Sequence, residues 1–173
     1  MIIGSISEDI TKEKRVSITP DIVKKYISLG LKVNLTKNYA VHLGMNDDQY
    51  KEEGANILDN QDDVISNSNA MLQMNILNDE NLNKLKKDQF LIGVLNPYSN
   101  KSKLNELALR KINCFSLELL PRITRAQSMD ILSSQANLAG YKAVIDSFAY
   151  FQKAIPMMMT AAGTISAAKV LVV

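Results

Sequence analysis

Polar side chains that could hold a small polar ligand gather between Pro121 and Ser133. Gln127, Asp130 and Ser133 follow one another at intervals of three residues, so at the start of a helix they share one stripe. An amide and a hydroxyl both donate and accept hydrogen bonds, whereas a carboxylate accepts them. Arg122 adds a planar fork of donors that binds a carboxylate or a phosphate, or stacks on a ring. Together these groups could donate hydrogen bonds to a polar ligand and accept hydrogen bonds from it.

The same residues also have a purely structural interpretation. Thr124 can cap a helix, Gln127 can lie in its first turn, and Asp130 can complement the helix dipole. Polar residues are the rule in first helical turns, so the residue types alone favour this structural interpretation.

Other reactive side chains are few. Cys114 lies in an apolar run typical of a strand, where a buried free thiol is expected rather than a disulfide or a nucleophile. His42, the only histidine, is expected to be a surface or packing residue of a loop. The three methionines at 157–159 point in different directions on any regular backbone, which indicates apolar packing at a hinge. No Cys/His cluster has metal-ligand spacing, so no metal is expected.

Charge and hydropathy exclude several classes of partner. The 20 basic and 18 acidic side chains give a net charge of +2, which leaves no strong field for nucleic acid or an anionic lipid surface. With 46% hydrophobic residues, the chain of 173 residues can bury a core. No apolar run reaches the roughly 18 residues of a membrane span, and the N-terminus does not resemble a signal peptide. We therefore expect a cytoplasmic protein that does not insert into a membrane.

Short apolar runs alternate with helical segments through much of the chain. Thr19 and Pro20 suit the cap and first position of a helix, and Gly30 suits its left-handed end. The alternation favours an α/β fold of the Rossmann-like or flavodoxin-like kind, a mostly parallel sheet with helices on both faces. Residues 56–69 form an Asn/Asp-rich stretch with no predicted element. The predicted strands are 1–6, 32–35, 70–74, 90–95 and 113–117, and the predicted helices are 20–28, 47–53, 79–85 and 101–111.

The segment after Pro121 has a different character. Residues 127–153 contain no proline and one glycine, which predicts a helix of about 20 residues or more that can cross between domains. Residues 169–173 have the composition of a buried parallel strand. We predict an N-terminal α/β domain at 1–126, a crossover helix and interdomain connection at 127–168, and the first strand of a truncated second Rossmann domain at 169–173.

Three stretches carry a resemblance to a known family. Residues 118–141 read ELLPRITRAQSMDILSSQANLAGY, which closely resembles the alpha subunit of proton-translocating NAD(P) transhydrogenase. Residues 157–164, MMMTAAGT, are similar to the connection into the second domain of the bacterial enzymes. The resemblance runs from end to end and is weakest between residues 46 and 113. The opening is similar to that subunit and to its relative alanine dehydrogenase in Gly4, Glu8, Arg15-Val16 and Thr19-Pro20.

The resemblance implies a subunit with two Rossmann-like domains, of which this chain matches the first. The second domain would hold most of NAD(H) on a glycine-rich fingerprint, and the sequence ends before such a fingerprint. By position, Arg122, Gln127 and Asp130 match the residues around the nicotinamide and its ribose, so they are the expected catalytic residues, and Ser133 matches a nearby hydroxyl. The expected cofactor-binding residues are Arg122, Ile123, Thr124, Arg125, Gln127, Ser128, Met129, Asp130 and Ser133.

The resemblance also implies partners. It implies a homodimer that works with NADP(H)-binding and membrane-spanning subunits, and a position at the inner face of the cell membrane reached through them. Neither nucleic acid nor a metal enters this expectation.

Two positions separate the transhydrogenase from alanine dehydrogenase. By position, the catalytic lysine of alanine dehydrogenase falls on Gln73 and its catalytic histidine near Val94, although Arg15 matches its substrate-carboxylate arginine. Oxidation of an amino acid needs a general base, whereas hydride passing between two nicotinamides needs none. We therefore predict a portion of a Re/Si-specific, proton-translocating transhydrogenase, inactive by itself, that transfers hydride from NADH to NADP⁺. The alternatives are an alanine dehydrogenase-like oxidoreductase and a non-catalytic truncated domain.

Overall fold

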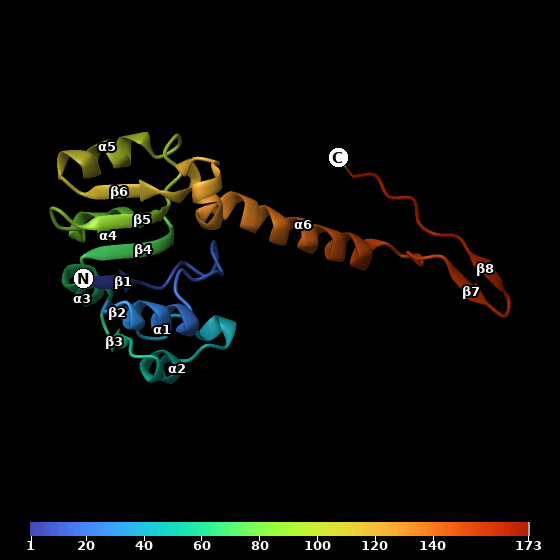
Figure 1. The fold of residues 1–173 in the computed structure, drawn as a ribbon, viewed down its shortest axis with the longest axis horizontal. Coiled ribbons are helices and arrows are strands. Elements are labelled where there is room, and N and C mark those ends of the chain that lie inside the picture. The colour runs from blue at the N-terminus through green and yellow to red at the C-terminus, as the bar shows by residue number, and fades with distance from the viewer. Residues whose placement is uncertain (173) are drawn as a thin grey trace. The chain divides into compact units, whose positions relative to one another are not determined.

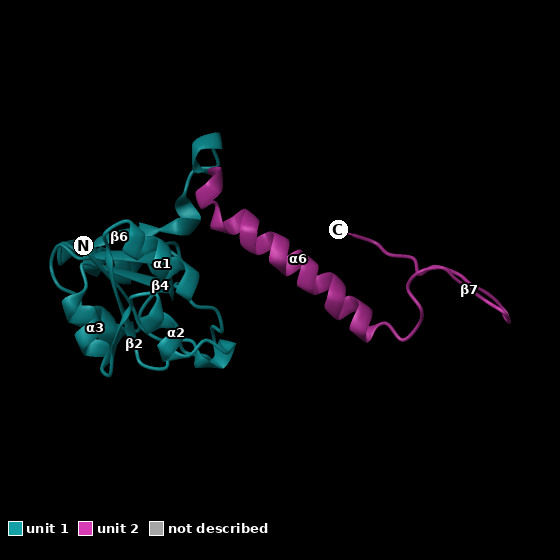
Figure 2. Ribbon diagram, turned by 60° about the horizontal axis from the view of Figure 1, so that its bottom comes forward, with its two compact units in different colours: residues 1–126 teal, residues 127–173 magenta. Residues whose placement is uncertain are grey.

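The computed structural model describes residues 1–172 and divides the chain into two compact units, one of residues 1–126 and one that begins at Gln127 (Figures 1 and 2). The first unit is an α/β domain. The second unit contains one long helix and a small hairpin.

The first unit is built on one six-stranded sheet in which every pairing is parallel. The strand order is β3-β2-β1-β4-β5-β6. This arrangement confirms the predicted α/β fold. The strands are β1 (Ile2–Ser5), β2 (Lys32–Thr36), β3 (Asn56–Leu58), β4 (Ala70–Asn75), β5 (Phe90–Val94) and β6 (Asn113–Ser116), and the helices are α1 (Pro20–Ser28), α2 (Asp47–Glu52), α3 (Gln61–Asn67), α4 (Asp79–Lys84) and α5 (Lys101–Leu109).

Helix α1 begins and ends where the sequence predicts. Pro20 occupies its first turn, and Gly30 follows its end with a φ of 76°, a left-handed conformation that glycine adopts without strain. Thr19 stands at the N-cap position, but its side chain makes no capping hydrogen bond, so the expected side-chain cap is wrong. Val23 is fully buried and attaches the helix to the sheet.

Two elements lie in the Asn/Asp-rich stretch for which no element was predicted. Strand β3 has only three residues, too few for an alternating pattern to be recognised. Asn60 caps helix α3, and its side chain accepts a hydrogen bond from the Asp62 amide at 3.0 Å. Val64 and Ile65 of α3 are completely buried, so two apolar residues are enough to hold this short helix on the sheet.

The two faces of the sheet carry separate apolar cores. Neighbouring residues of β4 point to opposite faces, so Met71 belongs to one core and Leu72 packs against the other. The first core joins the sheet to α3, α4 and α5, and the second joins it to α1 and α2. The buried residues of the first core are Ile6, Val64, Ile65, Met71, Leu77, Leu82, Leu85, Leu91, Leu95, Leu107 and Ile112. The buried residues of the second core are Ile3, Ile18, Val23, Val33, Leu35, Tyr39, Ala40, Tyr50 and Ala55.

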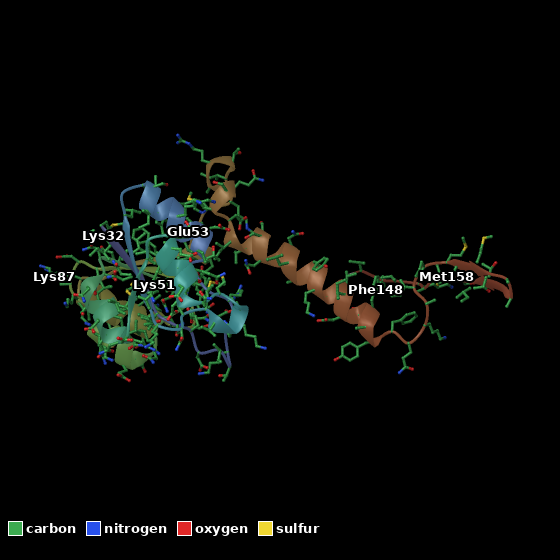
Figure 3. All side chains as sticks on the ribbon, turned by 90° about the horizontal axis from the view of Figure 1, so that it is seen from below. Lys32, Lys51, Glu53, Lys87, Phe148 and Met158 are labelled. Atoms are coloured by element: carbon green, nitrogen blue, oxygen red, sulfur yellow. The ribbon has the colours of Figure 1, made fainter. Side chains whose placement is uncertain are left out.

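The second unit contains the helix predicted after Pro121. Helix α6 spans Ile131–Tyr150 and has 20 residues, as expected, but it starts four residues after the predicted position. The reason is that residues Thr124–Met129 form a 3₁₀ helix and Asp130 caps α6. No residue of α6 is buried, and its apolar side chains, such as Phe148, are exposed (Figure 3).

The end of the described chain differs from the prediction. A connection was expected at 157–164, but Met158–Thr160 (β7) and Gly163–Ile165 (β8) pair as an antiparallel hairpin, with Met158 exposed (Figure 3). Residues 169–172 form no strand, although one was predicted there. A strand exists only through hydrogen bonds to a neighbour, and no strand of the described chain pairs with this segment. Among the described helices, none combines the length and hydropathy of a membrane-spanning segment.

The contact between β4 and β5 yields a stability prediction. A Cβ atom on Gly93 would lie 2.3 Å from the carbonyl oxygen of Gln73, whereas one on Gly140 would meet nothing within 4 Å. We expect Gly93→Ala to lower the free energy of unfolding by about 3 kcal/mol, because backbone atoms of paired strands cannot move apart freely. Urea unfolding followed by circular dichroism measures this, with Gly140→Ala as control. An unchanged midpoint for Gly93→Ala would contradict the tight strand pairing.

Candidate functional site

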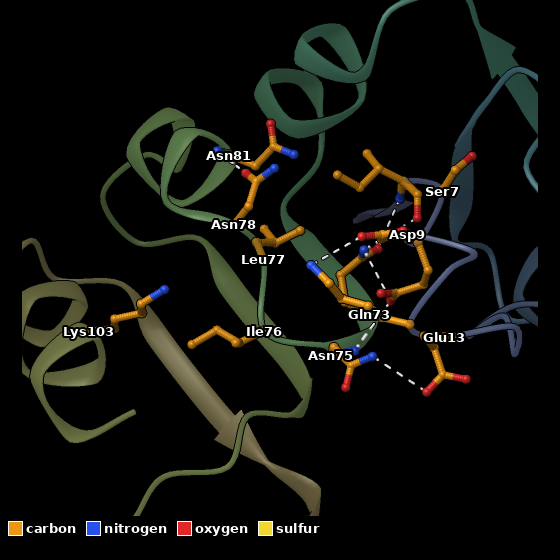
Figure 4. Close-up of a pocket in the computed structure, with 13 residues that line it drawn as sticks. Ser7, Asp9, Glu13, Gln73, Asn75, Ile76, Leu77, Asn78, Asn81 and Lys103 are labelled. Carbon is orange, nitrogen blue, oxygen red and sulfur yellow. Dashed lines mark hydrogen bonds and ion pairs between the residues drawn. The ribbon is translucent and has the colours of Figure 1, made fainter. Parts of the chain in front are cut away.

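A polar pocket lies at the carboxyl ends of β1 and β4 (Figure 4). The chain leaves β1 towards β2 and β3 on one side and later returns to β4 on the other, so the two connections diverge at this point. Such a point is where open parallel sheets bind their ligands. The cavity has a volume of about 490 Å³. Its lining residues are Ile6, Ser7, Glu8, Asp9, Lys12, Glu13, Gln73, Asn75, Ile76, Leu77, Asn78, Asn81 and Lys103.

The side-chain amide of Gln73 ties the two strand ends together. Its oxygen accepts hydrogen bonds from the Ser5 hydroxyl at 2.8 Å and from the Ile6 amide at 2.9 Å, and its nitrogen donates to the Ile6 carbonyl at 3.3 Å. Gln73 is 4% exposed, so these bonds replace water. The hydroxyl of Tyr39, whose pKa is raised by burial, lies 2.8 Å from the Ser5 hydroxyl and extends the network. The amide therefore serves structure and is not available as a base.

Glu8 occupies the turn after β1 and binds the end of β4. Its carboxylate accepts from the Met74 amide at 2.7 Å and from the Asn75 amide at 3.3 Å, where the pairing of β4 with β5 shifts register. The Gln73 amide adds a donor at 3.4 Å. Burial raises the pKa of Glu8 above its usual value in spite of these donors. This carboxyl group is therefore easier to protonate than an exposed one.

Glu13 and Arg15 form a forked ion pair beside the pocket. The Glu13 carboxylate accepts from Arg15 Nε at 2.8 Å, from Nη2 at 2.6 Å and from the Arg15 backbone amide at 2.9 Å. The Arg15 side chain lowers the pKa of Glu13 to about 2. The pair orients the guanidinium, so a ligand carboxylate at Arg15 would have to compete with Glu13.

The predicted loop residues lie mainly at the surface. Arg122, Ile123, Thr124 and Arg125 belong to the first unit and are exposed. In the second unit Gln127, Ser128 and Met129 are exposed, and they continue the 3₁₀ helix that starts at Thr124.

Two of the predicted site residues contact each other directly. The Asp130 carboxylate accepts from the Ser133 amide at 3.0 Å and from the Ser133 hydroxyl at 2.7 Å, and it caps α6. The structural interpretation expected Thr124 to cap the helix and Asp130 to complement its dipole, but the residue that caps α6 is Asp130. A ligand role for the same residues remains a prediction.

A model of the family described as "Alanine dehydrogenase/PNT, N-terminal domain" matches residues 4–139. The chain belongs to this family. It is 38% identical, over 99% of its length, to the first part of the NAD(P) transhydrogenase alpha subunit of Rickettsia prowazekii (strain Madrid E), and 41% identical, over 92% of its length, to the protein of the same name in Rhodospirillum rubrum. It spans 46% and 43% of the length of these two relatives.

The fold also matches a solved member of the family. A structure titled "The crystal structure of transhydrogenase from Sinorhizobium meliloti" superposes with a TM-score of 0.90 at 36% sequence identity, over 97% of this chain and 50% of that chain. The resemblance to the transhydrogenase alpha subunit, related to alanine dehydrogenase, is thereby confirmed.

The two positions that the sequence analysis matched to the catalytic lysine and histidine of alanine dehydrogenase are occupied by Gln73 and Val94. Gln73 lies in the buried network, and Val94, at the end of β5, is partly buried and carries no titratable group.

His42 is exposed, and its Nε2 lies 2.7 Å from the Lys14 carbonyl, so the expectation of a surface residue is confirmed. Cys114 lies on β6 and is only partly buried, less than expected, because β6 is an edge strand of the sheet.

The polar residues of the pocket, including Glu8, Glu13 and Asn75, were not among the predicted site residues. Glu8 follows β1, Glu13 lies in the same connection, and Asn75 ends β4. Because carboxyl ends of parallel strands meet at one edge of a sheet, polar residues after two apolar strands were a usable signal.

The low pKa of Glu13 makes its contribution to stability depend on pH. The folded-state pKa of about 2 lies below the ordinary value of 4.5, so ionised Glu13 stabilises the fold above about pH 4.5 and loses this effect as the pH falls through about 2. We expect Glu13→Gln to lower the free energy of unfolding at neutral pH and to have less effect as the pH falls from about 4.5. Urea titrations at several pH values measure the difference, with Glu52→Gln on the exposed side of α2 as control. A difference that is independent of pH would rule out the ion pair as its source.

Proposed function

We propose that the chain belongs to the NAD(H)-binding subunit of a proton-translocating NAD(P) transhydrogenase, which transfers hydride from NADH to NADP⁺ with Re/Si specificity. The observation that carries this proposal is the environment of Gln73. At the position of the alanine dehydrogenase lysine stands a neutral amide, buried and bound on both its oxygen and its nitrogen.

The chemistry of the two relatives explains why this residue matters. Dehydrogenation of an amino acid removes a proton from nitrogen while hydride leaves carbon, so a base must stand at that place. An amide cannot take this role, and Val94 offers no substitute for the histidine. Hydride transfer between two nicotinamides moves no such proton and needs neither residue.

The loop from Arg122 to Asp130 is the proposed nicotinamide-facing segment. The Arg122 and Gln127 side chains are exposed and are therefore accessible to a ligand. The amide of Gln127 offers the donor and acceptor that a carboxamide requires, so the residues present fit the cofactor. When bound, the dihydronicotinamide ring supplies the hydride. The remaining proposed contacts are Ile123, Thr124, Arg125, Ser128, Met129, Asp130 and Ser133.

The proposal includes partners that the chain does not contain. NADP(H) would bind to a partner subunit, other subunits would span the membrane, and the subunit would be a homodimer at the inner face of that membrane. The names of the relatives describe one portion of a subunit alpha, which supports a multi-subunit assembly. Residues 1–126 would then be the N-terminal domain, 127–168 the interdomain connection and 169–173 the start of the second domain.

An alanine dehydrogenase-like activity is the competing proposal, favoured by the arginine at position 15. Assay of the complete subunit with pyruvate, ammonia and NADH separates the two. Turnover of pyruvate without transhydrogenation would replace the function proposed here.

Arg122→Ala and Asp130→Asn test the loop in the complete subunit. Both are expected to slow hydride transfer by about a hundredfold, because small errors in ring position are costly, while NADH affinity changes little. Asparagine also caps helices, so Asp130→Asn removes the charge and keeps the cap of α6. Stopped-flow transhydrogenation with the partner NADP(H) domain and equilibrium NADH titration give the two quantities.

Ser134→Ala is a matched control, since the Ser134 hydroxyl donates to backbone carbonyls, those of Asp130 and Ile131. A normal rate with a collapsed affinity in the two loop variants would show that Arg122 and Asp130 anchor the cofactor and do not position it.

A polypeptide of residues 1–173 is expected to bind NADH weakly or not at all. Most dinucleotide affinity comes from a pyrophosphate held on a glycine-rich turn at a helix N-terminus, and this sequence has no such turn. Isothermal titration calorimetry measures the affinity. Micromolar binding would overturn the proposed division of labour between the two domains.

A further inference from the structure

Glu118 reaches from the segment after β6 to the end of β5. It lies in the 3₁₀ turn Leu117–Leu119, and its carboxylate accepts from the Leu95 amide at 3.3 Å and from the Asn96 amide at 2.5 Å. These two amides follow the last residue of β5, where a neighbouring strand no longer supplies acceptors. The carboxylate therefore takes the place of a strand at this edge of the sheet.

The peptide that Glu118 holds is also fixed from its other side. The Leu95 carbonyl accepts from the Asn100 side chain at 2.9 Å, and Leu95 itself is completely buried. Asn96 adopts a φ of 47°, a conformation that is uncommon outside glycine and that asparagine tolerates. The contacts with Leu95 and Asn96 thus give Glu118 a rigid partner.

The charge of Glu118 suits this contact. Burial acts to raise the pKa of Glu118, but the hydrogen bonds that its carboxylate accepts outweigh burial and keep the pKa below the usual value. Glu118 is accordingly ionised at neutral pH, and hydrogen bonds to an ionised acceptor are stronger than those to a neutral one.

The loop with the proposed cofactor contacts begins directly after this anchor. The Leu120 amide donates to the Leu117 carbonyl at 3.2 Å, and the Ile123 amide donates to the Pro121 carbonyl at 2.9 Å, so tight turns lead from Glu118 to Arg122. Downstream, Ala126 is 5% exposed, and its amide donates to the Ile123 carbonyl at 2.9 Å. The exposed residues 122–125 are therefore held between a charged anchor and a buried one.

We propose that Glu118 is a positioning residue: by binding the amides of Leu95 and Asn96 it sets the position of Arg122 and the residues that follow it. This inference rests on the proposed function, because it assigns Glu118 a role in hydride transfer through the loop. Glu118 touches neither nucleotide in this scheme. Its loss is expected to change the rate of transfer more than the binding of NADH.

The test uses the complete subunit with its NADP(H)-binding partner. Glu118→Ala removes both acceptors, Glu118→Gln keeps one oxygen that can accept, and Glu106→Gln removes an exposed carboxylate of α5 as control. We expect kcat to fall by between about tenfold and a hundredfold in Glu118→Ala, with KM for NADH within about twofold of the wild-type value. Glu118→Gln should be intermediate, and Glu106→Gln should behave as wild type.

A second measurement reports the loop without any cofactor. Limited trypsin digestion, with mass spectrometry of the cut sites, follows cleavage after Arg122 and Arg125. Glu118→Ala is expected to raise the rate of cleavage at these two sites by about tenfold, because the loop loses its charged anchor. The thermal unfolding midpoint, recorded in parallel, shows whether the domain as a whole has been weakened.

Three outcomes would overturn an assignment. Normal kcat and normal cleavage in Glu118→Ala, beside an active wild type, would remove the positioning role alone. Equal losses in kcat, NADH binding and thermal midpoint would show that Glu118 only stabilises the fold. A wild-type complete subunit that transfers no hydride with its partner would overturn the proposed function and the role of Glu118 with it.

Discussion

The bond between the Gln73 amide and the backbone of Ile6 joins the two strand ends on which the candidate site depends. It bridges β4 and β1, the neighbours between which the order of strands reverses. A buried amide needs partners for its oxygen and its nitrogen, and this one finds both at the end of β1, at Ser5 and at Ile6, which follows the strand. The pocket therefore contains one neutral, fully bonded amide, whereas its charged groups lie in the connection after β1 and, in the case of Lys103, on α5.

The carboxylates of that connection show how position alters the same functional group. Glu8 is desolvated and its pKa rises, whereas Glu13 receives the Arg15 guanidinium and its pKa falls. The consequences for stability have opposite signs, since lowering the pH relieves the cost of burying the Glu8 charge and removes the benefit of the Glu13 ion pair. The rim of the pocket thus combines a carboxyl group that is readily protonated with one that stays ionised.

The loop after β6 is held by different interactions at its two ends. At the first end an ionised side chain, Glu118, binds two backbone amides that follow another strand, and at the second Asp130 binds the first turn of its own helix. The exposed side chains between these ends gain little from burial, so their positions follow from the backbone. This division suits a segment whose side chains are free to meet a ligand.

Local rules were sufficient for much of the fold. The helix Pro20–Ser28 follows from Pro20 and Gly30, and the sheet with helices on both faces follows from the alternation of apolar and helical segments. The family and the change of character after Pro121 could also be read from the residues, as could the surface position of His42. Each of these features depends on residues that are close together in the sequence or on short sequence motifs.

Tertiary contacts decided the rest. Helix α3 exists because Val64 and Ile65 find a core, which the polar residues around them do not reveal. Residues 169–172 have the composition of a strand but form none, because a strand requires a neighbour and no strand of the described chain pairs with them. The pocket escaped prediction because Glu8, Gln73 and Asn75 are brought together only by the parallel pairing of β1 with β4, across more than 60 residues of sequence. The sequence determined which functional groups are present, and the long-range pairing of strands decided which of them lie in contact.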